Sequence, residues 1–544
     1  MLRSIPQLAD ALSLPADAVV PWGRDRAKVD PSVLLRGPGR NGRLVLVSAI
    51  NPTPAGEGKT TTSIGLAQGL ARLGHRAVAA LREPSLGPCF GTKGGGTGGG
   101  ASRLHPSADI NLHFTGDFHA VTSAHNLLAS AIDNHLHHGT GPALDPRRVT
   151  WPRVLDLNDR SLRRVLVGMG GAAEGVPRET GFEITAASEI MAILCLASDA
   201  ADLRARLDRI IVGSTRAGVP VTAAEIGVTG ALMALLKDAL WPNLVQTAEG
   251  VPAIVHGGPF ANIAHGCNSV LATRLARHTA DWVVTEAGFG FDLGGEKFFH
   301  IKAPQPGVGG PAVVVLVATL RALKMHGGIP LEQVDAPDAG AVSRGLANLE
   351  RHLEAVAAFG APVVVTLNQR PTDTEEERST VRVRLARLGV PFAPANPFGA
   401  GGAGCEDLAR AVLAAAPAVA PIPTPLYTAA TPIPDKVRAV VRRVYGGRDV
   451  LLGKQARADL ARIERLGFAH LPVCMARVPG SFTDDPSRAG APRGFDITVQ
   501  RVILQAGAGF LVALTGEVLR MPGLGARPQA ERVDLVNGEV VGVG

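Results

Sequence analysis

The sequence predicts an α/β protein with a mostly parallel sheet in a large N-terminal domain, followed by two smaller α/β domains. Short, continuously apolar segments such as 44–47 are typical of buried parallel strands. Apolar residues at helical spacing follow them, and many of these strands end in turns rich in glycine or acidic residues. The alternation continues from 151 to 330, which indicates parallel strands connected by helices.

A strand, a loop and a helix follow one another near the N-terminus. Residues 44–47 are the strand, and apolar residues recur at helical spacing from Ile64 to Leu73. The loop ends in Gly58-Lys59-Thr60, as in a P-loop, whose backbone amides and lysine bind nucleotide phosphates. Thr53 replaces the first glycine of that pattern, but the context favours a P-loop nucleotide-binding domain over a glycine-rich turn with a solvated lysine. The candidate nucleotide-binding residues are Thr53, Pro54, Ala55, Gly56, Glu57, Gly58, Lys59 and Thr60.

The next predicted strand, 77–81, leads directly into Arg82 and Glu83. In a parallel sheet, the residues just beyond the carboxyl end of a strand lie at the ligand-binding edge. An ion pair on the surface is the alternative interpretation. The position beside the predicted P-loop favours a functional role for both residues.

Residues 91–100 consist almost entirely of glycine and threonine. Glycine loses the most conformational freedom on folding, so this segment suits neither a helix nor a strand. It is either a flexible linker or a loop whose backbone approaches a ligand closely. Its place directly after Arg82 and Glu83 favours the loop.

Two further patterns leave alternatives open. Asn368 ends a predicted strand at 361–368, and Asp373 follows it. Together they suggest recognition of a nucleotide base, whereas an N-cap at Asp373 or Thr374 is the simpler interpretation. Seven histidines lie between 105 and 138. Three of them, His113, His119 and His125, are spaced by six residues, which does not place them on one helical face. Hydrogen-bonding histidines are therefore favoured over a metal site.

Composition limits the class of protein. The net charge is +7, but lysine and arginine are dispersed along the chain, which favours anionic small substrates over nucleic acid. No apolar stretch approaches the length of a membrane span, and the start of the chain lacks the apolar segment of a signal peptide. The five cysteines form no C-x-x-C pair, which is typical of a cytoplasmic protein. A proline-dense stretch at 418–435 is typical of a connection between domains. We expect domains at 1–330, 331–425 and 426–544.

Several long segments, in order along nearly the whole chain, resemble formate–tetrahydrofolate ligases. The segments that carry the resemblance are 51–62, 82–88, 110–117, 194–197, 256–269, 285–290, 371–374, 507–510 and 521–524. The family's own loop reads as this one does at Thr53. The resemblance implies that ATP, formate and tetrahydrofolate give 10-formyltetrahydrofolate, ADP and phosphate through formyl phosphate.

The resemblance also implies roles for individual residues. Lys59 and Arg82 hold the transferring phosphate and then formyl phosphate. Glu83 orients Arg82 or the folate amine, or accepts the amine proton. Mg²⁺ accompanies ATP, with Thr60 as its hydroxyl ligand. A monovalent cation, a polyglutamylated folate and a homotetramer are further expectations from the family, and neither nucleic acid nor a membrane is an expected partner.

The family sandwiches the pterin ring between two aromatic side chains, and the matching residues here are Phe289 and Phe398. Phe398 stands where family members usually have tryptophan, so we expect it to stack on the pterin ring with a smaller contact area. Other departures from the family are Ala303-Pro304, Pro479-Gly480, the glycine loop and the C-terminus. Two alternatives remain: an acyl-phosphate-forming ligase or ATPase with another acceptor, and a non-enzymatic nucleotide-gated binding protein.

Overall fold

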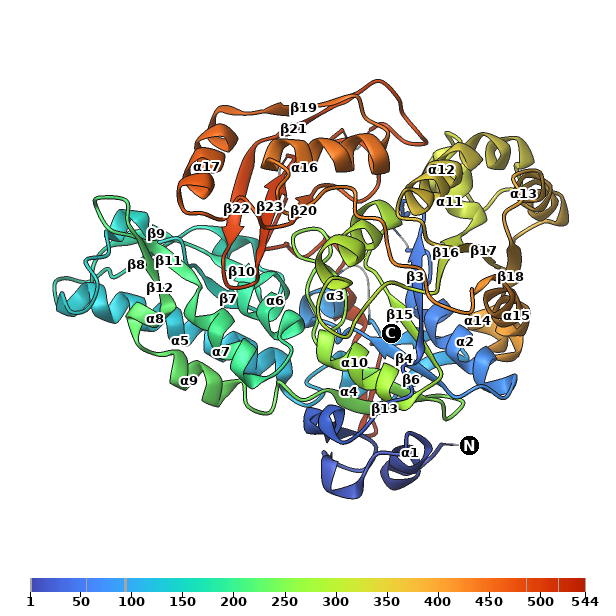
Figure 1. Ribbon diagram of the computed structural model, residues 1–544, viewed down its shortest axis with the longest axis horizontal. Coiled ribbons are helices and arrows are strands. Elements are labelled where there is room, and N and C mark those ends of the chain that lie inside the picture. The colour runs from blue at the N-terminus through green and yellow to red at the C-terminus, as the bar shows by residue number, and fades with distance from the viewer. Residues whose placement is uncertain (1, 55, 92–94, 486, 517, 544) are drawn as a thin grey trace.

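A twelve-stranded sheet forms the centre of the molecule (Figure 1). The computed structural model describes residues 2–54, 56–91, 95–485, 487–516 and 518–543. Every neighbouring pair from β14 to β18 is parallel, whereas β1, β2 and β13 pair antiparallel. The order across the sheet is β1 (Val19–Pro21), β2 (Ala27–Val29), β13 (Asn243–Thr247), β14 (Pro252–Val255), β4 (Ala77–Leu81), β15 (Trp282–Glu286), β3 (Arg43–Ala49), β16 (Val313–Ala318), β17 (Val363–Asn368) and β18 (Phe392–Ala395). In addition, β6 (Ser102–His105) pairs with β13, and β5 (Gly98–Gly99) pairs with β6.

The parallel strands are apolar on both faces because helices cover both faces of the sheet. In β3, Leu44 and Leu46 face one core, while Val45 and Val47 face the other. The predicted α/β class with a mostly parallel sheet is therefore confirmed. The helices on the first core include α10 (Val270–Thr279), α11 (Leu320–His326), α12 (Ala339–Ala358) and α13 (Glu375–Arg387), and those on the second include α2 (Lys59–Arg72) and α15 (Glu406–Ala415).

A lobe of helices and short strand pairs is inserted between β6 and β13 (Figure 1). The sequence places a strand at 209–213 among the alternating units of the sheet, but β11 lies outside it. β11 instead forms a hairpin with β12, because the chain turns back at Gly218, whose φ is +88°. The lobe contains α5 (Asp117–His138), α6 (Glu189–Leu196), α7 (Ala200–Asp208), α8 (Ala223–Ile226), α9 (Thr229–Leu235), β7 (Arg153–Leu155), β8 (Val165–Val167), β9 (Arg178–Thr180), β10 (Phe182–Ile184), β11 (Ile211–Ser214) and β12 (Pro220–Thr222).

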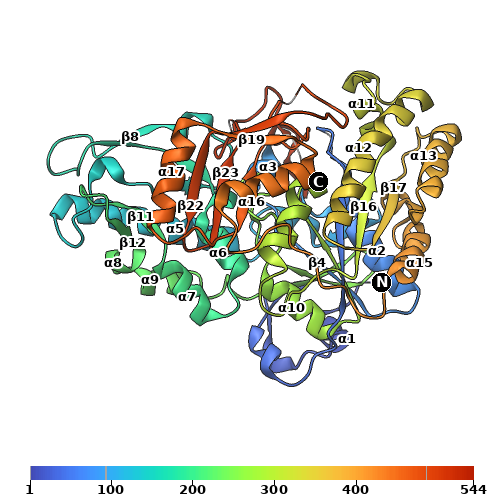
Figure 2. The ribbon, with the colours of Figure 1, turned by 45° about the horizontal axis from the view of Figure 1, so that its top comes forward.

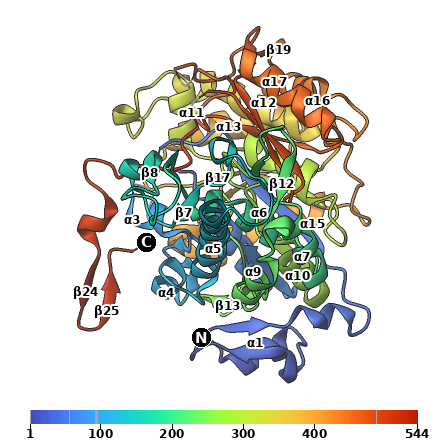
Figure 3. The same cartoon turned by 90° about the vertical axis from the view of Figure 1, so that its left-hand side faces the viewer.

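The C-terminal module carries small sheets of its own and lies against the inserted lobe and α12 (Figure 2). Its elements are α16 (Ile433–Val440), α17 (Lys454–Arg465), β19 (Asp449–Leu452), β20 (Val473–Ala476), β21 (Asp496–Val499), β22 (Arg501–Gln505) and β23 (Phe510–Leu514). A last hairpin, β24 (Asp534–Val536) and β25 (Glu539–Val541), extends away from these sheets (Figure 3). Strands β17 and β18, from the predicted 331–425 domain, continue the central sheet. The domain boundaries themselves stay a prediction.

The remaining helices are short: α1 (Ile5–Ala11), α3 (Leu86–Phe90), α4 (Ser107–Asn111) and α14 (Pro397–Ala400). No helix in the described ranges is long and apolar enough to cross a membrane.

Candidate active site

The loop between β3 and α2 is held in shape by a buried carboxylate. The Thr53 N–H donates to Glu57 Oε1 at 2.6 Å, and the Thr319 hydroxyl donates to Glu57 Oε2. Gly58 has a φ of +71°, and a Cβ there would lie 2.4 Å from Asn368 Nδ2, so the position requires glycine. The loop thus closes without a glycine at position 53. Of the candidate residues here, Pro54 is exposed, and Ala55 lies outside the described residues.

Charged side chains that follow or end the neighbouring strands β3, β15 and β4 lie at one edge of the sheet. Because β15 lies between β3 and β4, Glu286 at the end of β15 reaches the residues that follow both neighbours. The Thr60 hydroxyl donates to Glu286 Oε2 at 2.8 Å, and Arg82 Nη2 lies 3.4 Å from Glu286 Oε1. Burial lowers the pKa of Lys59, while Glu286 and Glu57 oppose that shift. The structure therefore brings Lys59, Thr60 and Arg82 together around Glu286.

Sequence reasoning did not select Glu286, although a signal for it was present. Glu286 directly follows the apolar strand residues 282–285, just as Arg82 follows 77–81. The criterion that identified Arg82, a charged side chain at the carboxyl end of a parallel strand, identifies Glu286 equally well.

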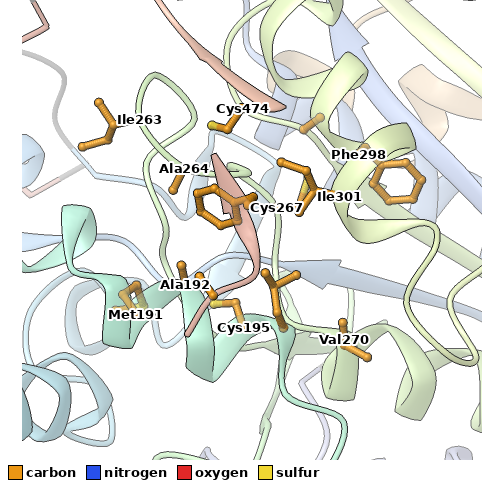
Figure 4. Close-up of a cluster of buried hydrophobic side chains, with 14 of the residues drawn as sticks. Met191, Ala192, Cys195, Ile263, Ala264, Cys267, Val270, Phe298, Ile301 and Cys474 are labelled. Carbon is orange, nitrogen blue, oxygen red and sulfur yellow. The ribbon is translucent and has the colours of Figure 1, made fainter. Parts of the chain in front are cut away.

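The Arg82 guanidinium is enclosed by the loop that follows β14. Its Nη1 donates to the Pro259 carbonyl at 3.2 Å, and a Cβ on Gly288 would lie 3.0 Å from the same nitrogen. Other residues of this loop are apolar: Ile263, Ala264 and Cys267 lie in a buried hydrophobic cluster with side chains from α6 and β20 (Figure 4). This packing fixes the loop that holds the arginine.

The same loop carries polar atoms that sequence reasoning also passed over. Both ring nitrogens of His265, Asn262 Oδ1 and Asn268 Nδ2 are buried without a hydrogen-bond partner in the part of the chain that the structure describes. Burial, with Lys302 and Arg82 nearby, pushes the pKa of His265 well below its usual range. His265 is thus a neutral imidazole in positively charged surroundings.

Glu83 is buried beside other carboxyl groups rather than beside Glu286. Burial raises its pKa well above the usual range, Asp117 and Asp156 add to the rise, and Lys28 opposes it. Its Oε2 atom makes no hydrogen bond to any described residue. Glu83 therefore holds a proton more strongly than an ordinary glutamate.

The two predicted folate aromatics lie at different places on the carboxyl edge. Phe289 follows β15 with a φ of +59° and is half-buried. Phe398 belongs to α14, after the edge strand β18, and is 63% exposed. Strands β3, β16 and β17 lie between β15 and β18, so the structure does not place the two residues on neighbouring strands.

The described part of the glycine-rich segment is not a linker. Gly98 and Gly99 form β5, and the Ala101 N–H donates to the Phe398 carbonyl at 2.9 Å. A Cβ on Gly100 would lie 2.2 Å from that carbonyl oxygen, so the close approach is to α14. Residues 92–94 lie outside the described ranges, so whether the segment also approaches a ligand stays a prediction.

The remaining open patterns receive structural explanations. Thr374 caps α13 in a capping box with Glu377, which confirms the N-cap interpretation, while Asn368 Nδ2 donates to the Glu57 carbonyl at 3.1 Å.

His125 bonds to Ser188 Oγ at 2.8 Å and to the Pro152 carbonyl at 3.0 Å. His135 bonds to two carbonyls. Among the described residues, no group of three or more His, Cys, Asp or Glu side chains could hold a metal ion.

Distant parts of the chain support the residue at the start of the loop, Asn51. Its amide nitrogen donates to Asp292 Oδ2 at 3.0 Å and to the Pro479 carbonyl at 3.3 Å. Asn348 Nδ2 donates to Asn51 Oδ1 at 3.0 Å, and Asp292 also forms a buried ion pair with Arg477. The C-terminal module therefore contacts the site loop directly.

The fold and this site are typical of an α/β enzyme: a lysine, an arginine and an acidic side chain gather at the carboxyl ends of neighbouring parallel strands, the edge at which ligands bind in such sheets. The family described as formate–tetrahydrofolate ligase matches residues 1–544. Proteins named formate–tetrahydrofolate ligase from Myxococcus xanthus (strain DK1622), Methylobacterium sp. (strain 4-46) and Arthrobacter sp. (strain FB24) are 56%, 52% and 54% identical. These matches cover 100%, 100% and 98% of this chain and 99%, 98% and 95% of the relatives. The chain belongs to the formate–tetrahydrofolate ligase family.

Proposed function

We propose that the protein uses ATP with Mg²⁺ to join formate to tetrahydrofolate, giving 10-formyltetrahydrofolate, ADP and phosphate by way of formyl phosphate. The observation that carries this assignment of the site is the position of Glu286, which contacts Thr60 after β3 and Arg82 after β4. A lysine and an arginine are thereby held at one strand edge beside a loop of the P-loop type. Family membership supports the overall ligase reaction.

The first step is phosphoryl transfer to formate. Formate is already a carboxylate at neutral pH, so one of its oxygens attacks the γ-phosphorus without a general base, and ADP leaves. The main requirement is to align two anions and neutralise their charge. Lys59 and Arg82 supply the positive charge, and Glu286 keeps the arginine in position.

The Mg²⁺ that accompanies ATP fits the oxygen atoms at this place. The Thr60 hydroxyl, whose proton points to Glu286, leaves its oxygen lone pairs available to a hard cation. Mg²⁺ supplies charge neutralisation to the nucleotide phosphates. A monovalent cation is a further expectation from the family, with no residue assigned to it.

The second step forms the C–N bond. The N10 amine attacks the formyl carbon, phosphate leaves, and the amine gives up its proton. Glu83 accepts that proton when it is ionised, and its raised pKa makes it a stronger base than an ordinary carboxylate. Activity should therefore rise with pH as Glu83 loses its own proton.

Phe289 and Phe398 are proposed to contact the pterin ring. We expect Phe398→Trp to lower the KM for tetrahydrofolate about threefold with little change in kcat, because a larger exposed ring offers more stacking area. Phe398→Leu should raise that KM, while the KM values for ATP and formate should be unchanged. Steady-state kinetics with each substrate varied in turn would check this. A tetrahydrofolate KM that is equal in all three proteins would remove Phe398 from the folate site.

Glu286→Gln is expected to lower kcat by about 10²-fold, because the variant keeps the shape of the side chain but removes the charge that holds Arg82. The measurement is kcat with all substrates saturating, compared with thermal unfolding. Asp459→Asn is a matched control, because Asp459 on α17 also contacts an arginine, Arg501, at 2.7 Å, outside the site. Wild-type kcat in Glu286→Gln would contradict a role for Glu286 in positioning Arg82.

The test of the proposed function is an omission assay. Purified protein receives ATP, Mg²⁺, formate and tetrahydrofolate, and 10-formyltetrahydrofolate is measured by absorbance after conversion to methenyltetrahydrofolate in acid. Product should require every substrate. Formate-dependent release of phosphate without formyltetrahydrofolate would indicate another acceptor, an alternative that the family matches do not favour. A cytoplasmic location, a homotetramer and a polyglutamylated substrate are separate proposals that rest on composition and family.

A further inference from the structure

Lys28 is a buried cation next to the proposed catalytic site. It lies on β2, and its side chain is 1% exposed. Its Nζ atom donates to Asp117 Oδ1 at 2.5 Å and to the Trp241 carbonyl at 3.0 Å. Asp117, the first residue of α5, accepts a second hydrogen bond at Oδ2 from Asn243 Nδ2 at 2.8 Å. The Thr115 hydroxyl donates to Asn243 Oδ1 at 2.8 Å, so both partners of the ion pair are held in place.

Residues paired across neighbouring strands connect this ion pair to the segment that carries Glu83. Lys28 pairs with Asn243, Asn243 with Val255, and Val255 with Leu81. Glu83 follows Leu81 by two residues.

A close contact at Gly258 joins the two regions. A Cβ on Gly258 would lie 2.5 Å from the Glu83 carbonyl and 2.4 Å from the Phe118 ring. Phe118 directly follows Asp117, so the first turn of α5 is packed close to Glu83.

Lys28 counters the effect of the carboxyl groups around Glu83. Asp117 and Asp156 are the carboxyl groups that act on Glu83, and Lys28 is the cation that opposes them. Cys195 and His256 also interact with these groups. Burial raises the pKa of the Cys195 thiol and lowers the pKa of His256 to about 4, so both side chains are neutral near pH 7.

Stability alone is a weak explanation for such an ion pair. Burying two charges costs desolvation energy that their attraction barely offsets, and well-packed apolar residues often serve equally well. An ammonium held beside a cluster of carboxyl groups does, however, set how readily those groups ionise. We propose that Lys28 and Asp117 are positioning residues that control the charge of Glu83 during formyl transfer. This inference rests on the proposed function, in which Glu83 receives the amine proton.

Lys28 and Asp117 shift the pKa of Glu83 in opposite directions. Lys28→Met removes the cation that favours ionised Glu83, so the rise of kcat with pH should move to higher pH. At pH 7, kcat should then fall about tenfold, the factor that corresponds to one pH unit. Asp117→Asn keeps the side-chain shape but removes an anion, so the rise should move to lower pH. The double variant Lys28→Met with Asp117→Asn should return towards the wild-type profile.

The experiment measures kcat for 10-formyltetrahydrofolate formation from pH 5.5 to 9, at saturating substrates, in the wild type, these three variants and a control variant. Thermal unfolding is followed in parallel, because Lys28→Met leaves Asp117 buried without its partner and is expected to be less stable. Asp117→Asn leaves the Lys28 ammonium without its carboxylate but still bonded to the Trp241 carbonyl, and the double variant buries neither charge. These two variants keep the test usable if Lys28→Met does not fold. Lys324→Met is the matched control, because it breaks another buried ion pair, to Glu377 at 3.0 Å, far from Glu83 in the fold.

Opposite shifts in Lys28→Met and Asp117→Asn, with no shift in Lys324→Met, would support the inference. If Lys28→Met does not fold, a shift to lower pH in Asp117→Asn that is reversed in the double variant would support it. Equal pH profiles in all variants, or shifts in the same direction, would overturn it. Wild-type protein without formyltetrahydrofolate production would instead reject the proposed function, so the two failures are distinguishable.

Discussion

Lys59→Ala is expected to lower the kcat of formyltetrahydrofolate formation by about 10³-fold or more while the protein stays folded. Lys59 opens α2 at the loop and is half-buried, with Glu286 and Glu57 close enough to favour its charged form. A positive charge fixed at this place acts on the transferring phosphate in a partly dry environment, where electrostatic stabilisation is strongest. Removing it leaves Glu286 and Glu57 facing the substrate anions.

The measurement is kcat with all substrates saturating, together with the unfolding temperature. Lys454→Ala is a suitable control, because Lys454 also begins a helix, α17, but is exposed and distant from the site. Lys59→Arg should recover only part of the activity, since the guanidinium differs in shape from the ammonium. Wild-type activity in Lys59→Ala, or loss of the folded state, would contradict the assignment of Lys59 to the phosphates.

Arg82→Ala is expected to have an effect of similar size, about 10³-fold in kcat. Two contacts aim the guanidinium, the Glu286 carboxylate at 3.4 Å and the Pro259 carbonyl at 3.2 Å, and Gly288 leaves room for it. A planar, preorganised fork suits the two oxygens of a phosphate or an acyl phosphate. Arg82→Lys keeps the charge without the fork, so it should lose about 10- to 100-fold.

Formate-dependent phosphate release separates the two steps in this variant. If Arg82 acts on the transferring phosphate, Arg82→Ala should lose phosphate release and formyl transfer together. Combining Arg82→Ala with Glu286→Gln should cost little more than Arg82→Ala alone, because the carboxylate acts through the arginine. Fully additive losses would show that Glu286 acts independently of Arg82.

Local patterns predicted the centre of the site. Lys59 and Thr60 are recognisable because a strand, a loop and a helix are contiguous in sequence, and Arg82 because it ends an apolar strand. Glu286 is equally local but was recognised only when the strand order placed β15 between β3 and β4. Which strand ends become neighbours is a property of the topology and not of any one segment.

Other features depend on contacts that sequence patterns do not contain. The ion pair of Lys28 with Asp117 joins β2, the second strand from one edge of the sheet, to the start of a helix 89 positions later. The strand at 211–214 has the composition of its parallel counterparts, yet the turn at Gly218 folds it into a hairpin. The relation between Phe289 and Phe398 is also set by strand order, because three strands separate β15 from β18.

The support of Asn51 by the C-terminal module has a consequence for synthesis of the protein. Lys59, Arg82 and Glu286 leave the ribosome long before Pro479 and Arg477, whose contacts complete the surroundings of Asn51 and Asp292. Until then, the Asp292 carboxylate lacks its arginine and the start of the loop lacks one of its hydrogen bonds. A growing chain therefore contains every proposed catalytic side chain before it contains the parts that hold them in working order. The loop that precedes Lys59 therefore reaches its complete set of contacts only after residues 477–479 have been synthesised.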